Sequence, residues 1–101
     1  MAYWLVRAIP KGDLNELQTQ LDRHAFDDVK PFGEALSAGL RGARVEPDGT
    51  AVWEEEDYCV PPLAQERAFI LDRYFQDIRV TDVGEGNGWK QIEHLPKLFE
   101  A

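Results

Sequence analysis

The sequence predicts an α+β fold in which two helices cover one face of a four-stranded antiparallel sheet. Three stretches carry the prediction: a strand-like start at Tyr3–Ile9, a turn at Pro47–Gly49 between two short strand-like runs, and an amphipathic helix over Pro61–Ile78. A last strand-like run, Ile78–Val83, completes the order β-α-β-β-α-β. An extra short helix and a C-terminal tail are expected in addition to this order.

Length and composition indicate one globular domain. The 101 residues are enough for a single core, and a hydrophobic content of 44% is typical of a folded chain. We expect a domain over residues 1–101, with its core in 3–83 and a tail in 84–101. No apolar run is long enough to span a bilayer, and the start lacks the pattern of a signal peptide. A single cysteine, Cys59, excludes an internal disulfide and favours a cytoplasmic location.

The formal net charge of −8 limits the classes of partner. Nucleic-acid binding depends on neutralising phosphates with Lys and Arg, so the sequence argues against it. The same charge argues against an anionic membrane surface. A basic protein partner, or solubility alone, fits the charge better.

Alternation divides the first strand, Tyr3–Ile9, into two faces. The apolar face is expected to point inward and the face with the only charge outward. The inward set is Trp4, Val6 and Ala8, and the outward set is Tyr3, Leu5, Arg7 and Ile9.

The next two segments have helical patterns. Asp13 is a suitable N-cap, with Glu16 completing a capping box. The apolar residues that follow at helical spacing are Leu14, Leu17, Leu21 and Ala25. His24 is interpreted as a histidine favoured by the C-terminal end of the helix dipole, not as a catalytic group. A second, shorter helix is expected from Pro31 to near Gly39 or Gly42.

The hairpin is the clearest local signal. Pro47 presets the first corner of the turn, and Gly49 is expected at positive φ. The run Glu54–Asp57 follows directly, and four acids could in principle hold a hard cation. Because consecutive residues of an extended chain point alternately to opposite sides, we interpret the run as a solvated loop. No metal and no cofactor are expected.

The helix predicted over Pro61–Ile78 contains two residues that break its pattern. Arg67 falls within the apolar arc, and we expect its stem to be buried and its guanidinium to pair with a carboxylate of the run Glu54–Asp57. An anion-binding arginine in a cleft is the alternative. Phe69 falls within the polar arc, either as an isolated exposed aromatic or as a docking anchor.

Two segments invite a catalytic or ligand-binding interpretation that we do not favour. Cys59 precedes a helix, but the acids before it should raise its pKa, which suits a buried thiol better than a nucleophile. The glycine loop over residues 84–88 lacks phosphate-binding spacing and is interpreted as a turn. The tail beyond it carries an apolar stripe and is expected to pack back on the domain or on a second subunit. Its stripe is Trp89, Ile92, Leu95, Leu98 and Phe99.

The order of elements over roughly residues 3 to 83 resembles a ferredoxin-like plait. Such a fold carries many unrelated functions, so the resemblance implies none by itself. Two hypotheses remain. The favoured one is a binding or assembly module that acts through protein–protein contacts as a homodimer, using Tyr3, Leu5, Ile9, Phe69 and Trp89. The alternative is a small enzyme or anionic-ligand-binding domain whose pocket is lined by Arg7, Arg67 and Arg79. No catalytic residue is predicted, and catalysis is less favoured.

Overall fold

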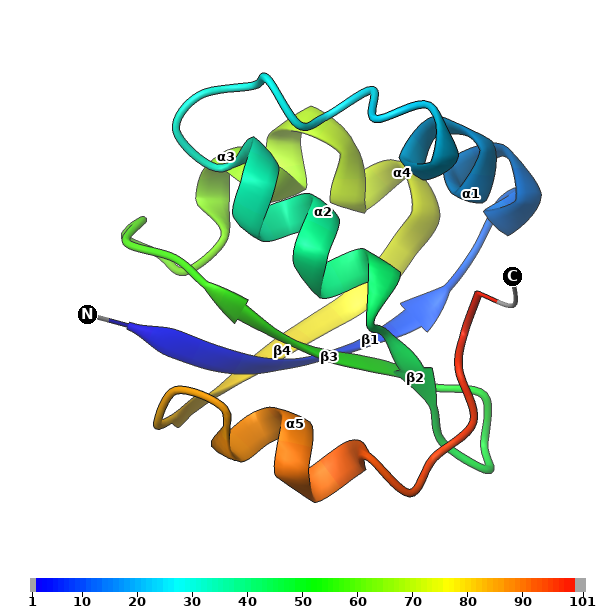
Figure 1. The fold of residues 1–101 in the computed structure, drawn as a ribbon, viewed down its shortest axis with the longest axis vertical. Helices are drawn as coiled ribbons and strands as arrows, with labels where there is room; N and C mark the ends of the chain where they lie inside the picture. The colour runs from blue at the N-terminus through cyan, green and yellow to red at the C-terminus, as the bar shows by residue number, and fades with distance from the viewer. Residues whose placement is uncertain (1, 100–101) are drawn as a thin grey trace.

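The computed structural model describes residues 2–99, which form an α+β fold around a four-stranded antiparallel sheet. The strand order is β2-β3-β1-β4 (Figure 1). The strands are β1 (Tyr3–Pro10), β2 (Arg44–Val45), β3 (Ala51–Glu56) and β4 (Phe75–Val83). The predicted hairpin is therefore confirmed as β2 and β3, with Gly49 in the turn at φ +91°.

Helices lie on both faces of the sheet. The helices are α1 (Leu14–Asp22), α2 (Gly33–Arg41), α3 (Ala64–Glu66), the π-helical turn η1 (Arg67–Leu71), α4 (Asp72–Tyr74) and α5 (Asn87–Ile92). In Figure 1 the segments from α1 to α4 lie above the sheet and α5 lies beneath it. The expectation of helices on one face holds for all of them except α5. Within residues 2–99, none of these helices has the length and apolar character needed to cross a membrane.

The main core fills the space between the sheet and the helices above it. It is apolar, and the inward face predicted for β1 belongs to it: Val6 and Ala8 are buried, and Trp4 packs against the cluster. Other buried members include Leu17, Leu21, Leu36, Leu40, Trp53, Leu63, Leu71, Tyr74 and Phe75. A second, smaller cluster of Leu5, Val52 and Ile92 lies between the sheet and α5.

The start of α1 follows the sequence closely. The Asp13 carboxylate accepts hydrogen bonds from the backbone N–H groups of Asn15 and Glu16, at 2.9 and 3.2 Å. Such a cap satisfies donors that the first turn of a helix leaves free. The helix ends at Asp22, so Ala25 lies beyond it and is exposed, contrary to the predicted stripe.

The helix predicted over Pro61–Ile78 is shorter than expected. It begins at Ala64, after Leu63 adopts a left-handed conformation at φ +62°. It ends at Tyr74, because Phe75 and Gln76 pair with Pro10 and Ile9 of β1 as the start of β4. Tertiary pairing thus overrides the helical period, which cannot by itself distinguish a helix end from a strand start.

A bulge interrupts the pairing of β1 with β4. Arg7 pairs with Arg79, whereas Ile9, only two residues further, pairs with Gln76. One extra residue is therefore inserted in β4, and Asp77 in this stretch has φ +52°. Bulges of this kind bend an edge strand and increase its twist. Ile78 and Val80 still pack against the main core, as the sequence predicts.

The glycine loop before α5 is fixed by an acid of the sheet. The Glu54 carboxylate accepts hydrogen bonds from the backbone N–H groups of Gly86 and Gly88, at 2.9 and 2.8 Å. A Cβ atom on Gly88 would lie 2.9 Å from Glu54 Oε1, so a side chain there would displace the carboxylate. The loop therefore binds an anion of the protein itself, and the tail packs back on its own chain as expected.

We predict that Gly49→Val lowers the free energy of unfolding by about 1 to 2 kcal/mol, because valine is strained at positive φ. No atom lies within 4 Å of a Cβ at this position, so strain would be the only cause. Thermal or urea unfolding measures the loss. An unchanged midpoint would show that the turn adapts without cost.

We also predict that Glu54→Gln loosens α5, because an amide presents one acceptor where the carboxylate presents two. The loss of charge-assisted hydrogen bonds should cost about 1.5 to 3 kcal/mol. Hydrogen exchange of the Gly86 and Gly88 amides should accelerate. Glu85→Gln, an equal charge change at an exposed position of the same loop, is the control. Equal protection of the Gly86 and Gly88 amides against exchange in both variants would contradict the role of Glu54 as a cap of this loop.

Candidate functional site

The candidate site lies where β3 ends and the four consecutive acids begin. Glu54, Glu55 and Asp57 are all buried, and Glu56 is half-buried. The interpretation of this run as a solvated loop is therefore wrong. The reason is that β3 continues through Glu56 and carries the acids into the interior. The expected alternation is present: Glu54 contacts the α5 loop, whereas Glu55 faces Glu66 of α3 on the opposite side.

Three carboxyl groups meet on the helix side of the sheet: Glu55, Asp57 and Glu66. Glu66 is 0% exposed and Glu55 2%. Glu55 Oε1 accepts a hydrogen bond from the indole N–H of Trp53 at 3.0 Å. The other oxygens of the two glutamates, Glu55 Oε2 and Glu66 Oε2, are buried without a hydrogen-bond donor. No Lys or Arg of residues 2–99 forms an ion pair with any of the three carboxyl groups.

Burial changes the protonation of these acids. It raises the pKa of Glu55 well above the ordinary 4.5, and the neighbouring Glu66 adds to the rise. Burial also raises the pKa of Glu66. A carboxylate loses its hydration in the interior, and a second negative charge nearby disfavours ionisation further. The pair therefore retains a proton at pH values where a solvated glutamate has lost it.

Cys59 belongs to the same cluster. Its Sγ lies 4.0 Å from Glu66 Oε1, and Asp57 Oδ2 accepts hydrogen bonds from the backbone N–H groups of Cys59 and Leu63, at 3.1 and 2.6 Å. A backbone hydrogen bond at Gln65 acts to lower the pKa of the thiol, but burial, Asp57 and Glu66 together raise it. The predicted upward shift is confirmed. A thiol in this state is a poor nucleophile.

A surface cavity of about 360 Å³ reaches the cluster. Asp57 and Cys59 form part of its wall. The remaining lining residues are Pro31, Phe32, Ala35, Glu56, Tyr58 and Gln65. Two of the clustered groups are thus accessible to a ligand, while Glu55 and Glu66 lie deeper.

The arginines predicted to share a pocket are only partly brought together. Arg7 and Arg79 are paired across β1 and β4 and line a cavity of about 320 Å³ on the other face of the sheet. Arg67 does not line it. Its Nη2 donates to the Ile78 carbonyl oxygen at 3.4 Å, and its Nε is buried without a partner. The expected ion pair between Arg67 and the run Glu54–Asp57 is therefore wrong.

The residues predicted to form an interface do not lie on one surface. Leu5 is buried because α5 covers it, and the half-buried Trp89 ring packs where Gly42 leaves room. Tyr3 is half-buried, and a hydrogen bond with Glu56 raises its pKa to about 12. Ile9 and Phe69 remain exposed, at 40% and 44%. The outward face predicted for β1 is thus covered in part by the chain's own tail.

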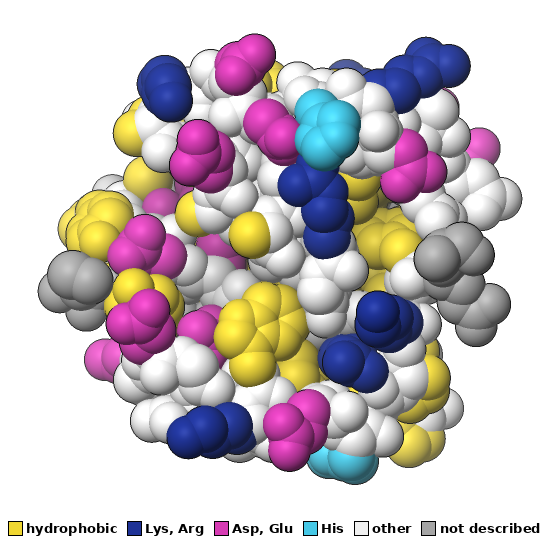
Figure 2. Space-filling view, in the orientation of Figure 1, with side chains coloured by type: hydrophobic (Ala, Val, Ile, Leu, Met, Phe, Trp, Pro, Cys, Tyr) yellow, Lys and Arg dark blue, Asp and Glu magenta, His cyan; other side chains and the backbone are white. Residues whose placement is uncertain are grey.

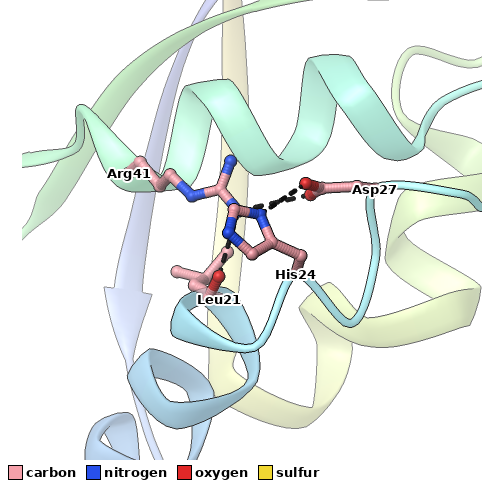
Figure 3. A network of polar contacts seen from close by, with 4 residues as sticks. All are labelled: Leu21, His24, Asp27 and Arg41. Atoms are coloured by element: carbon pink, nitrogen blue, oxygen red, sulfur yellow. Dashed lines mark hydrogen bonds and ion pairs between the residues drawn. The ribbon is translucent and has the colours of Figure 1, made fainter.

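His24 takes part in a surface network that joins α1 to α2 (Figure 3). Its Nδ1 lies 2.7 Å from Asp27 Oδ2 and 3.0 Å from Arg41 Nη2. The same Arg41 nitrogen donates to the Leu21 carbonyl oxygen at 3.0 Å. These contacts fix the end of α1, which agrees with a structural role for this histidine.

Sequence reasoning missed Glu54 and Glu66. Glu54 was placed in a solvated loop, and Glu66 was given no role. No local signal could have placed them, because Glu66 is buried by tertiary packing and Glu54 is bound by a loop 32 residues away.

No protein-family model matches the chain, and comparisons with curated proteins and with solved structures found no match. The residues of the site itself are therefore the basis for any functional conclusion. Their distinctive feature is a group of buried acids without a basic partner among the described residues.

We predict that the contribution of Glu55 to stability falls as pH rises. Because the pKa of Glu55 is raised in the folded state, the folded protein binds more protons than the unfolded chain above about pH 4.5. The stabilisation is complete below that pH and is lost as pH rises through the folded pKa. In metal-free buffer, Glu55→Gln should therefore unfold at a higher temperature than the wild type at pH 8 and at the same temperature near pH 4.

The exposed Glu93→Gln serves as the charge control for this comparison. Glutamine retains the oxygen that accepts from Trp53 and adds a donor directed at Glu66, so its packing cost is small. If the difference in unfolding temperature between the wild type and Glu55→Gln were the same at pH 8 and near pH 4, Glu55 would be ionised without cost in the folded protein.

Proposed function

We propose that the protein is a small acidic binding module that acts through protein–protein contacts. The observation that carries the proposal is an exposed apolar segment beside the cavity at the end of β3. Val60 is 95% exposed and Tyr58 64%. Large apolar side chains exposed together are typical of interaction sites. Figure 2 shows hydrophobic and acidic side chains side by side at the left edge, where the segment after β3 lies.

The docking surface consists of the exposed Tyr58, Val60 and Phe69 together with the 360 Å³ cavity that Tyr58 lines. Tyr58 lines the cavity, and the Phe69 ring packs against Phe32, another lining residue, at a centroid distance of 5.5 Å. Asp57 holds both ends of the exposed segment through its bonds to Cys59 and Leu63. A segment fixed in this way loses little conformational entropy on binding, which favours affinity.

The partner that fits this surface presents an apolar side chain flanked by Lys or Arg. The apolar group would enter the cavity, and the basic groups would face Glu56 and the acidic surface of a chain with net charge −8. Opposite charges across an interface accelerate association and exclude partners of the wrong sign. A second copy of the chain, as in the homodimer expected from the sequence, is the other occupant that the experiment below tests.

The proposal includes the fold and the location. A ferredoxin-like plait is supported by the strand order β2-β3-β1-β4 and by helical connections between β1 and β2 and between β3 and β4. We take the chain as a single domain of this kind. A cytoplasmic location is supported by the lone Cys59, which has no partner for a disulfide within the chain.

The anionic-ligand hypothesis has one specific observation in its favour, the shared cavity of Arg7 and Arg79. Three carboxylates, those of Glu46, Asp48 and Asp77, line the same cavity, and Glu46 already pairs with Arg7 at 3.3 Å. The acids outnumber the bases there, so the cavity offers an anion little net attraction. We therefore rank this function second.

The test is a selection of peptides from a random library on the immobilised wild-type protein, with fluorescence-anisotropy titration of the enriched peptides. We predict enriched sequences that combine an aromatic or aliphatic residue with Lys or Arg. Val60→Asp should weaken their binding by about tenfold or more, as expected for an interface anchor worth over 1.4 kcal/mol.

Ile9→Asp is the matched control, because Ile9 is exposed and apolar but lies beside the other cavity. Sedimentation of the wild type and both variants reports self-association. A dimer lost only in Val60→Asp would make a second copy the occupant of the docking surface. Peptides that bind both variants equally, or no enrichment together with a monomer, would contradict the proposed function.

A further inference from the structure

Three potential metal ligands converge at the inner end of the 360 Å³ cavity. They are a carboxylate oxygen of Asp57, the Sγ of Cys59 and a carboxylate oxygen of Glu66, and all three atoms lie within 4.8 Å of one another. Asp57 and Cys59 come from the segment after β3, and Glu66 comes from α3. Two rigidly placed elements therefore present ligands to one point.

A second observation, the burial of carboxylate oxygens, indicates that the group could accommodate a cation. Glu66 is fully buried, and apart from a proton that the two carboxyl groups could share, no group donates a hydrogen bond to its Oε2 or to Oε2 of the adjacent Glu55. Buried carboxylate oxygens in folded proteins are almost always satisfied by a donor, a positive charge or a metal ion. Among residues 2–99 no basic side chain pairs with these acids.

We propose that Asp57, Cys59 and Glu66 form a binding site for a divalent metal ion of the zinc type. The chemistry of the donors selects this class. Mg²⁺ and Ca²⁺ take oxygen ligands, whereas a cysteine sulfur favours zinc and similar borderline ions. A dication also neutralises two of the negative charges that the cluster would otherwise bury.

The geometry suits a site with three protein ligands. Zinc bonds of about 2.0 to 2.3 Å place tetrahedral ligand atoms roughly 3.3 to 3.8 Å apart, so a contraction of about 1 Å from the widest spacing closes the site. Asp57 and Cys59 also line the cavity, which leaves the fourth position open to water or to a ligand atom. Glu55 lies directly behind Glu66 and would support that ligand from outside the coordination sphere.

The competing account is that a proton alone compensates the acids. Both accounts satisfy the buried oxygens, but only a metal engages the sulfur of Cys59. On metal binding the thiol releases its proton to the solvent and the sulfur forms the metal bond. A spectroscopic probe of that bond therefore separates the two.

The experiment uses the full chain, stripped with EDTA and exchanged into chelator-free buffer. Addition of Co²⁺ should produce a thiolate-to-cobalt charge-transfer absorption that saturates at one equivalent, and one equivalent of Zn²⁺ should abolish it. Native mass spectrometry with Zn²⁺ should show a single bound ion. Cys59→Ser should remove the absorption, and Glu66→Gln should weaken Zn²⁺ binding by about tenfold or more.

Glu93→Gln removes an equal charge at an exposed site and should leave binding unchanged. Circular dichroism checks that each variant folds. If a variant does not fold, the cobalt spectrum of the wild type still shows whether Cys59 binds the metal. Absence of metal binding at micromolar excess would show that protons alone compensate the cluster. Binding without the thiolate absorption, and insensitive to Glu66→Gln, would place the ion on surface groups such as His24 or His94 and would overturn the site.

Discussion

The burial of carboxyl groups without basic partners is the constraint on which this structure depends. Four acids follow one another where β3 ends, and three of them are buried. Transfer of an ionised carboxylate from water to a protein interior costs several kcal/mol of free energy unless hydrogen-bond donors or positive charge replace its hydration. The chain meets this cost differently at each position. Glu54 takes backbone N–H groups of the α5 loop, and Asp57 takes those of Cys59 and Leu63. Glu55 has one indole donor and shares its environment with Glu66.

Much of the architecture follows from these contacts. By binding the glycine loop, Glu54 places α5 over Leu5 and closes the sheet face that the first strand would otherwise leave bare. By binding Leu63, Asp57 sets the start of the helical segment and holds the loop that exposes Tyr58 and Val60. The same acids thus fix the tail on one face of the sheet and shape the cavity on the other. Partner binding and metal binding, as proposed above, would both use that cavity.

Local chemistry allowed part of this to be predicted from the sequence. The Asp13 cap, the turn at Gly49 and the alternation of Trp4, Val6 and Ala8 depend on near neighbours, and each is found where expected. The end of the long helix could not be located, because Phe75 fits both a helix stripe and a strand. The burial of Glu54 and Glu66 depends on residues distant in sequence or on tertiary packing. The interpretation of Glu54–Asp57 as a solvated loop was wrong because the density of charge in the sequence does not show that β3 continues through Glu56.

In the folded protein, the cluster of Glu55, Asp57 and Glu66 carries fewer negative charges than three fully ionised carboxyl groups would. Carbon-13 NMR of the Glu55 side-chain carboxyl, assigned with Glu55→Gln and followed from pH 3 to pH 9 in metal-free buffer, tests it most directly. We expect this carbon to titrate well above the ordinary glutamate value of 4.5. A Glu55 carboxyl that titrates near 4.5 would mean that the folded protein accommodates its charge, and the account of this cluster would be wrong.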